Sequence, residues 1–262
     1  MDERSTIADW PDIEVVPGRV ATIELRRPPN NYFDTELIEQ LAATFEALAA
    51  DGECRAVVLC SQGKHFCAGA NFGSGPSQPS NGRQGVHLYD AALALFEQPL
   101  PVVAAVQGAA IGGGLGLALS ADFRVAAPES RFSANFARLG FHHGFGLTIT
   151  LPAVVGQQTA LDLLYTGRRV EGDAALRMGL CDRLAPRSEL QACASNLAEE
   201  IASSAPLAVR SIRLTMRGHL AGAIRAALDR EKDEQARLMR THDWAEGVKA
   251  SAERRQPDFV GQ

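Results

Sequence analysis

The chain has 262 residues, of which 46% are hydrophobic and 22% are charged. These proportions are typical of a globular protein with a substantial core, and they exclude disordered, collagen-like and coiled-coil chains. The formal net charge is −5, from 26 basic and 31 acidic residues. We therefore expect no general binding to nucleic acid. The length allows one large domain or two small ones.

The cysteine pattern and the apolar segments bear on where the protein works. Its five cysteines are an odd number and form no CxxC pair, which predicts free thiols in a reducing compartment. The first residues, MDERSTIADWPD, lack the apolar stretch of a signal peptide. The most apolar segment, residues 100–106, is much shorter than the ~20 residues of a membrane span. We expect a cytoplasmic protein with no membrane partner.

Four short segments read as strands. Residues 20–25 (VATIEL) alternate with period two, as in a half-buried strand. Residues 56–60, 101–106 and 123–126 are dominated by apolar side chains, which is typical of strands buried on both faces. Helical patterns separate these segments. The order indicates βα units with mostly parallel pairing, hence an α/β fold.

Helical patterns fill most of the remaining chain. One helix should begin near Asp34 or Thr35 and present one apolar face, formed by Leu37, Leu41, Phe45 and Leu48. From about Ser188 strand signals end, and four helices are predicted over residues 188–204, 206–217, 219–240 and 243–255. Such a helical part would pack on the core or on a neighbouring subunit. Residues 73–82, rich in Gly, Ser and Pro, predict a mobile loop.

Two glycine-rich turns follow predicted strands. Residues 108–116 (GAAIGGGLG) lead into a helix over residues 114–121, but fit neither a dinucleotide-binding nor a phosphate-loop pattern. Residues 63–71 (GKHFCAGAN) follow the strand 56–60. Each turn can leave backbone N–H groups free, and two such donors aimed at one carbonyl oxygen form an oxyanion hole. For residues 108–116, the alternative interpretation is that the glycines only permit close packing of helix on sheet.

These turns belong to a series of motifs spread over nearly the whole chain. In order they are LRRPPN (25–30), HFCAGA (65–70), GAAIGGG (108–114), ADFRVA (121–126), LPAVVG (151–156), YTGR (165–168), AALRMGL (174–180) and RQPDF (255–259). In this order they resemble the crotonase, or enoyl-CoA hydratase/isomerase, superfamily.

The resemblance implies a fold, a substrate and an assembly. The fold is a spiral of ββα turns, with an acyl-CoA-binding core over residues 1–200 and a helical trimerisation region over residues 201–262. The substrate is an acyl-CoA thioester, with coenzyme A as part of it and with no metal or redox cofactor. The assembly is a homotrimer or a dimer of trimers. The oxyanion donors carried over by position are the N–H groups of Ala70 and Gly113.

The chain departs from the family where carboxylates are expected. The two hydratase glutamates align with Gly116 and Phe136, and the carboxylate of many isomerases aligns with Gly144. Because hydration needs an acid and a base, each worth ~10²–10⁴-fold in rate, ordinary hydratase activity should be weak or absent. If only these acids are missing, Gly116→Glu with Phe136→Glu should raise hydration of crotonyl-CoA.

His142 and His143 flank Gly144 and are candidates to replace the missing acids, since histidine titrates near neutral pH. We expect at most one of them to face the acyl pocket and the other to be structural. If neither is catalytic, both simply hold the loop through hydrogen bonds.

Other side chains are assigned to substrate binding by position. Tyr89 and the nearby His87 should line the acyl pocket, and Phe136 should make it drier. Arg26, Lys64, Phe66 and Ala68 match coenzyme A contacts of the family. Cationic residues near the C-terminus, namely Lys249, Arg254 and Arg255, are candidates for a coenzyme A phosphate, although each is also a plausible solvated helix charge.

The sequence therefore predicts an acyl-CoA enzyme that holds a thioester enolate in an oxyanion hole. Alternative reactions are isomerisation, thioester hydrolysis and C–C cleavage. A non-catalytic acyl-CoA-binding oligomer is the alternative from another class: the two intact donor turns favour an enzyme, whereas the missing carboxylates favour a binding protein.

Overall fold

The computed structural model describes residues 8–71 and 87–262, so the loop predicted over residues 73–82 lies outside the described residues. The larger sheet has the strand order β1-β2-β3-β4-β6-β9. Only β1 pairs antiparallel with its neighbour, and the other pairs are parallel, as expected for βα units. Its strands are β1 (Ile13–Val16), β2 (Val20–Leu25), β3 (Ala56–Ser61), β4 (Val102–Val106), β6 (Phe123–Ala126) and β9 (Arg183–Leu184).

A smaller sheet stands beside the larger one and has the order β5-β7-β8. Its strands are β5 (Ala109–Ile111), β7 (Arg131–Ser133) and β8 (Val170–Glu171). The chain alternates between the sheets: β4 of the larger sheet continues into β5 of the smaller, and β6 continues into β7. Helix α3 (Gly113–Ser120) follows β5 directly. This repetition is the spiral of ββα turns predicted from the resemblance.

Helices cover both faces of the larger sheet, so β3 is buried along its whole length. Asp34 caps α1 (Thr35–Asp51) by accepting a hydrogen bond of 2.9 Å from Leu37 N, which confirms the predicted start of this helix. Helix α7 (Leu190–Ala202) packs on the opposite face, against alternate residues of β3, β4 and β6. The remaining helices before residue 203 are α2 (Leu88–Glu97), α4 (Leu147–Val155), α5 (Gln157–Thr166), α6 (Gly172–Arg177) and 3₁₀ turns over Asn135–Leu139 and Arg187–Glu189.

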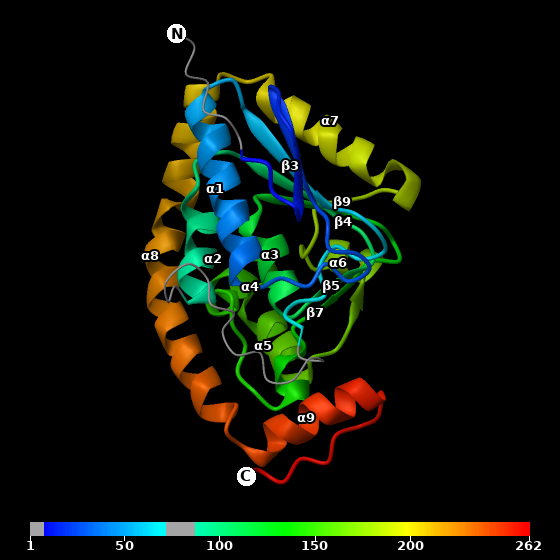
Figure 1. Cartoon of the computed structure of the whole chain (residues 1–262). Coiled ribbons are helices and arrows are strands. Elements are labelled where there is room, and N and C mark those ends of the chain that lie inside the picture. Colours follow the sequence, from blue (N-terminus) through cyan, green and yellow to red (C-terminus); the bar gives the residue numbers. More distant parts are fainter. Residues whose placement is uncertain (1–7, 72–86) are drawn as a thin grey trace.

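The C-terminal part forms two helices, α8 (Pro206–Leu238) and α9 (His242–Glu253). The prediction of separate helices over residues 206–217 and 219–240 is wrong, because α8 runs through Gly218 without a break. A single glycine costs a helix only about 1 kcal/mol, and strong helix formers such as Arg217 and Leu220 lie close to this one. Figure 1 shows α8 along one side of the molecule, beside α2, with α9 beneath it at the other end. The second half of α8 packs into the core through Ile224, Ala227 and Leu228.

All five cysteines are free, as the sequence predicts. Four of them are buried, and burial raises the pKa of the Cys67 thiol to about 12. Within residues 8–71 and 87–262, no helix combines the length and the apolar character that crossing a membrane requires.

Candidate active site

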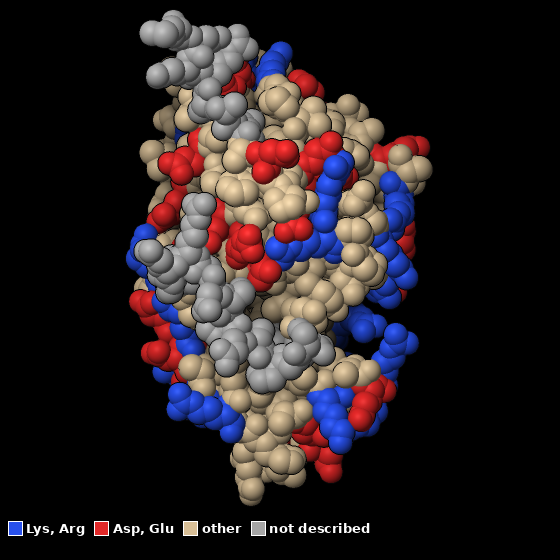
Figure 2. All heavy atoms as spheres, viewed as in Figure 1, with Lys and Arg blue, Asp and Glu red and all other residues tan. Residues whose placement is uncertain are grey.

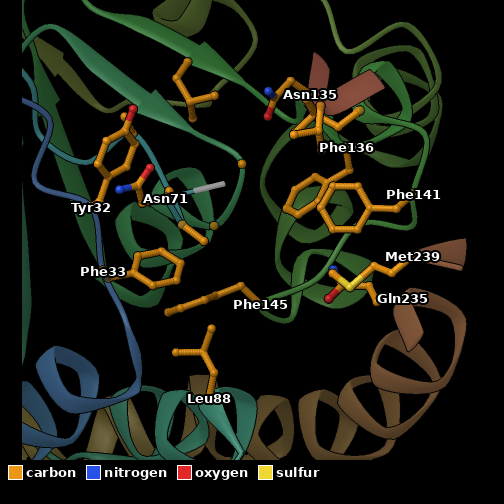
Figure 3. A pocket seen from close by; sticks show the side chains of 18 of the residues that line it. Tyr32, Phe33, Asn71, Leu88, Asn135, Phe136, Phe141, Phe145, Gln235 and Met239 are labelled. Carbon is orange, nitrogen blue, oxygen red and sulfur yellow. The ribbon is translucent and has the colours of Figure 1, made fainter. Parts of the chain in front are cut away.

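A cavity of about 700 Å³ opens where the turns after the strands meet α2, α8 and α9. In Figure 3, Tyr32, Phe33 and Asn71 lie on one side of it, and Phe136, Phe141, Gln235 and Met239 on the other. Aromatic rings dominate its walls: Phe33 and Phe145 have ring centroids 5.3 Å apart, as do Phe136 and Phe141. The cavity therefore suits an apolar group such as an acyl chain.

The two predicted donor turns lie side by side at this cavity. Cys67 N donates to Ala109 O at 2.9 Å, and Ile111 N donates to Cys67 O at 3.0 Å. This short parallel pairing joins the segment after β3 to β5. Helix α3 then starts against the same segment, and a Cβ on Gly114 would overlap the carbonyl oxygen of Cys67. Glycine at 114 is what lets the helix begin so close to the other turn.

Ala70 and Gly113 supply the two candidate donors, and both residues line the cavity. Gly113 is the first residue of α3, so its N–H lies outside the ladder of helical hydrogen bonds. Neither N–H has a hydrogen-bond acceptor within the described residues. Two unpaired N–H groups at adjacent turns, one of them at a helix N-terminus, can hold an anionic oxygen.

Aromatic side chains occupy the space beside Gly116 and Gly144, two of the three positions where the sequence analysis expects carboxylates in the family. A Cβ on Gly116 would lie 2.7 Å from Phe145 Cβ, and a Cβ on Gly144 would overlap the Tyr89 hydroxyl. Phe145 is fully buried and has φ +60°, a left-handed conformation that is rare for a bulky residue. Phe136, at the third acid position, lines the cavity. No Asp or Glu is found among the described residues of the lining.

Tyr89 lies on the first turn of α2 and joins the cavity wall to α8. Its hydroxyl donates to Gln235 Oε1 at 2.8 Å. Burial raises the pKa of Tyr89 well above its ordinary value, so the phenol keeps its proton. The adjacent His87 also lines the cavity. Its Nδ1 accepts from Tyr89 N at 3.1 Å and caps α2.

The structure does not place His142 or His143 among the residues that line the cavity. His142 Nδ1 lies 2.7 Å from His143 O, and His143 Nε2 lies 2.9 Å from Thr148 Oγ1. The two rings stack with centroids 4.1 Å apart. The expectation that one of them faces the acyl pocket is thus corrected. Both rings are held by partners within the loop or at the start of α4, and the geometry matches the loop-holding alternative.

The partner that organises this loop is Glu231 of α8, which the sequence analysis missed. The residue is fully buried. Its carboxylate accepts from Gly146 N at 2.9 Å, Thr148 N at 3.0 Å and Thr148 Oγ1 at 2.6 Å, so it caps the N-terminus of α4. Burial raises its pKa, although these hydrogen bonds oppose the shift. Within a run of charges on a long helix, the sequence offers no sign that this one is buried.

Stability should fall in acid through His143. Burial, and then the neighbouring His142, lower the pKa of His143 to about 4, against ~6.5 in an unfolded chain. Above pH 6.5 the neutral ring contributes its full share of stability, and this share is lost as the pH falls from 6.5 through 4, since the unfolded chain binds the proton more readily. Urea unfolding between pH 7.5 and 4.5 should therefore show a steeper acid decline for the parent than for His143→Gln. Equal slopes would contradict this prediction.

The residues assigned to coenzyme A divide into two groups. Ala68 lines the cavity, whereas Arg26, Lys64 and Phe66 do not. Arg26 pairs with Glu14 and Glu24, and Phe66 is fully buried. Their binding roles stay predictions.

Basic side chains nevertheless gather near the turn that carries Lys64. Burial lowers the pKa of His65, and the nearby cations Lys64, Arg131 and Arg187 lower it further. Figure 2 shows Lys and Arg side chains along the right edge of the molecule, while acidic ones predominate in the upper half of this face. A positive edge of this kind can attract an anionic ligand.

The cations predicted near the C-terminus also differ in whether they line the cavity. Lys249 lines the cavity, whereas Arg255 is paired with Glu246 and Glu253. Sequence reasoning missed Lys232 and Gln235, which line the cavity from α8, and Met239, which lies directly after the last residue of α8. The signal available for them is their spacing of three and four residues, which places all three on one face of the helix.

Comparison with known proteins identifies the family. The family model described as enoyl-CoA hydratase/isomerase matches residues 16–262. A Mycobacterium tuberculosis protein named "Probable enoyl-CoA hydratase EchA14" is 36% identical over 251 residues, covering 94% of this chain and 93% of the relative. The short-chain-enoyl-CoA hydratase of Clostridium acetobutylicum is 32% identical, covering 91% of this chain and 93% of the relative.

A solved structure agrees with these sequence relatives. The crystal structure of an enoyl-CoA hydratase/isomerase from Pseudoalteromonas atlantica superposes with a TM-score of 0.86 at 31% identity, covering 95% of this chain and 100% of that one. The match extends through the helical C-terminal region. The chain belongs to the enoyl-CoA hydratase/isomerase family and is an enzyme of that family.

Proposed function

We propose that this enzyme binds an acyl-CoA thioester and stabilises its enolate through the N–H groups of Ala70 and Gly113. The observation that carries the proposal is the pair of unpaired N–H groups on adjacent turns at the wall of an apolar cavity. The thioester oxygen would accept both hydrogen bonds, and the dipole of α3 would favour the negative charge that develops there. One such donor is worth ~3–4 kcal/mol of transition-state stabilisation.

The reaction should differ from ordinary hydration. A hydratase needs a base to activate water and an acid for the α-carbon, and the described lining holds no carboxylate for either task. Tyr89 is a protonated donor, and Lys232 is already paired with Asp90 and Asp229. C–C cleavage of an acyl-CoA fits this lining better, because the electron pair of the broken bond forms the enolate and no base has to remove an α-proton. Isomerisation and thioester hydrolysis are the alternatives, and hydrolysis would use the same two N–H groups to hold its tetrahedral oxyanion.

The test is a panel of acyl-CoA thioesters assayed for hydration, isomerisation, hydrolysis and cleavage, with binding measured by calorimetry at low salt. We expect binding of several thioesters, turnover by at least one non-hydrating route and little hydration of crotonyl-CoA. Rapid hydration would contradict the proposed reaction class. Binding without any turnover would support a binding protein instead, and no binding at all would overturn the proposal.

The proposal extends to a homotrimer or a dimer of trimers. In the first half of α8, Leu207, Ile212, Leu214 and Met216 are between 62% and 79% exposed, and exposed apolar side chains in such number favour an interface between protein chains. Light scattering should give a mass of three or six chains, and a monomer would contradict this part. Lys64 and Lys249 are the cations proposed to meet coenzyme A phosphates, and the free cysteines support a reducing compartment such as the cytoplasm.

A further inference from the structure

One wall of the cavity carries a buried amide whose hydrogen-bonding capacity is not used up. Gln235 is 8% exposed and lines the cavity from α8. Its neighbours in the lining, Ala236, Met239 and Phe145, are apolar. Figure 3 shows it across the cavity from Tyr32 and Asn71. An amide in such surroundings costs free energy unless its donors and acceptor are paired.

The two partners of Gln235 fix the orientation of the amide. Tyr89 Oη donates to Gln235 Oε1 at 2.8 Å, and Gln235 Nε2 donates to His142 O at 2.9 Å. Since Tyr89 keeps its proton, the Oε1 atom is the acceptor and the Nε2 atom is the donor. A primary amide has two N–H bonds, and only one is used here. The second N–H has no acceptor among the described residues.

The Gln235 amide lies away from the candidate oxyanion turn, where the distal part of an acyl chain would be. Gly113 contacts the Phe33 ring, Phe33 contacts Phe145, and Phe145 contacts Tyr89, the partner of Gln235. Three aromatic rings, those of Phe33, Phe145 and Tyr89, therefore lie along this path between the candidate oxyanion turn and the amide. A thioester held at Ala70 and Gly113 would bring a distant part of the chain, rather than its reacting carbons, towards Gln235.

The charges around the amide also select what can bind. The described lining has no Asp or Glu that would repel an electron-rich oxygen, and it includes Lys232 and Lys249. Lys232 Nζ is 3.1 Å from Asp90 and 3.0 Å from Asp229, so its charge is largely compensated. Lys249 is a cation proposed above to meet a coenzyme A phosphate. The unused N–H is thus the feature left for the acyl group, and it complements an acceptor oxygen.

We propose that Gln235 determines substrate specificity by hydrogen-bonding an acceptor oxygen, in a keto or carboxylate group, carried on the acyl chain away from the thioester. The substrates are then oxygen-substituted acyl-CoA thioesters rather than plain alkyl ones. This inference rests on the proposed binding of acyl-CoA. A ligand that lacks the oxygen leaves a buried N–H unpaired, which is the basis for discrimination.

The test compares matched thioesters of four, six and eight carbons, each as the plain acyl-CoA, the form with a terminal carboxylate and the form with a keto group next to the chain end. Calorimetry gives Kd for the parent and for Gln235→Met, which keeps length but removes the amide. For at least one chain length, we expect the parent to bind an oxygenated thioester at least ~10-fold more tightly than the plain thioester of the same length. This ratio of Kd values corresponds to one hydrogen bond. In Gln235→Met this ratio should fall to about one.

Thr148→Val is the matched control. It disturbs the same loop by removing a hydroxyl that binds Glu231, but it leaves the Gln235 amide in place, so the ratio should persist. A ratio lost equally in Thr148→Val would overturn the inference, because loosening of the loop would then explain it. A preference for the carboxylate alone that survives Gln235→Met would also overturn it and assign recognition to the lysines. Equal binding of all forms to the parent refutes the inference alone, whereas no binding of any thioester refutes the proposed function.

Discussion

Gly114→Ala is expected to lower kcat/KM at least ~100-fold on whichever thioester the parent turns over. The added Cβ would overlap the carbonyl oxygen of Cys67 and would also lie 2.7 Å from Cys67 C. Both atoms are backbone, so the clash is relieved only by moving α3 away from the neighbouring turn. That movement separates the N–H groups of Ala70 and Gly113, and loss of one oxyanion donor costs ~10²–10³ in rate.

Gly222→Ala makes the same chemical change in α8, where a Cβ meets nothing within 4 Å, so its kcat/KM should match the parent. Circular dichroism and a melting curve establish that Gly114→Ala is folded. A folded Gly114→Ala enzyme with parental kcat/KM would refute the assignment of the oxyanion turn.

Restoring the glutamates at positions 116 and 136 should destabilise the protein and give no gain in hydration. The sequence alone favours a gain, but a Cβ at 116 would lie 2.7 Å from Phe145 Cβ and 2.9 Å from Phe145 Cγ. The Cβ atom of Phe145 is fixed by the backbone, so a change of side-chain rotamer cannot relieve the contact with it. Overpacking costs ~1–3 kcal/mol, and burial of a carboxylate adds a further penalty. We therefore expect Gly116→Glu with Phe136→Glu to lose about 3 kcal/mol or more of unfolding free energy, measured in urea.

The matched comparison adds Phe145→Gly to the double variant. It removes the obstructing ring and places glycine at a left-handed φ of +60°, which glycine adopts without strain. Part of the lost unfolding free energy should return, whereas Phe145→Gly in the parent should destabilise by leaving a cavity. If Gly116→Glu with Phe136→Glu is as stable as the parent, Phe145 is not the obstacle, and our account of the acid positions is wrong.

The main elements of the fold were predictable because their signals are local. The alternation in residues 20–25 and the apolar runs at 56–60 and 123–126 reflect burial on one or both faces, and β2, β3 and β6 follow them closely. Strands of two residues, such as β8 and β9, are too short to show an alternating pattern of apolar and polar side chains. The uninterrupted α8 was missed because glycine weakens a helix locally, while packing along its whole length decides whether the helix continues.

The site was predictable where turn motifs or position along the family pattern carry it, as for Tyr89 and Phe136, which line the cavity as expected. Ala70 and Gly113 follow from turn motifs, and both line the cavity. His143 is held by Thr148, which in turn is held by Glu231, a residue more than 80 positions away along the chain. Such distant partners leave no local pattern in the sequence. The same holds for Tyr89 and Gln235, whose hydrogen bond fills the space beside Gly144.

Because α8 is one helix of 33 residues, it is a rod about 50 Å long at 1.5 Å per residue. Its first half carries the exposed leucines, and its second half carries Lys232, Gln235 and Ala236 at the cavity. Because no hinge interrupts the helix, a small tilt of its N-terminal end would displace the residues at its C-terminal end. In the proposed oligomer, neighbouring chains that contact its first half would therefore influence the width of the acyl pocket. Residues 1–200 on their own would lack the wall of the pocket that α8 provides.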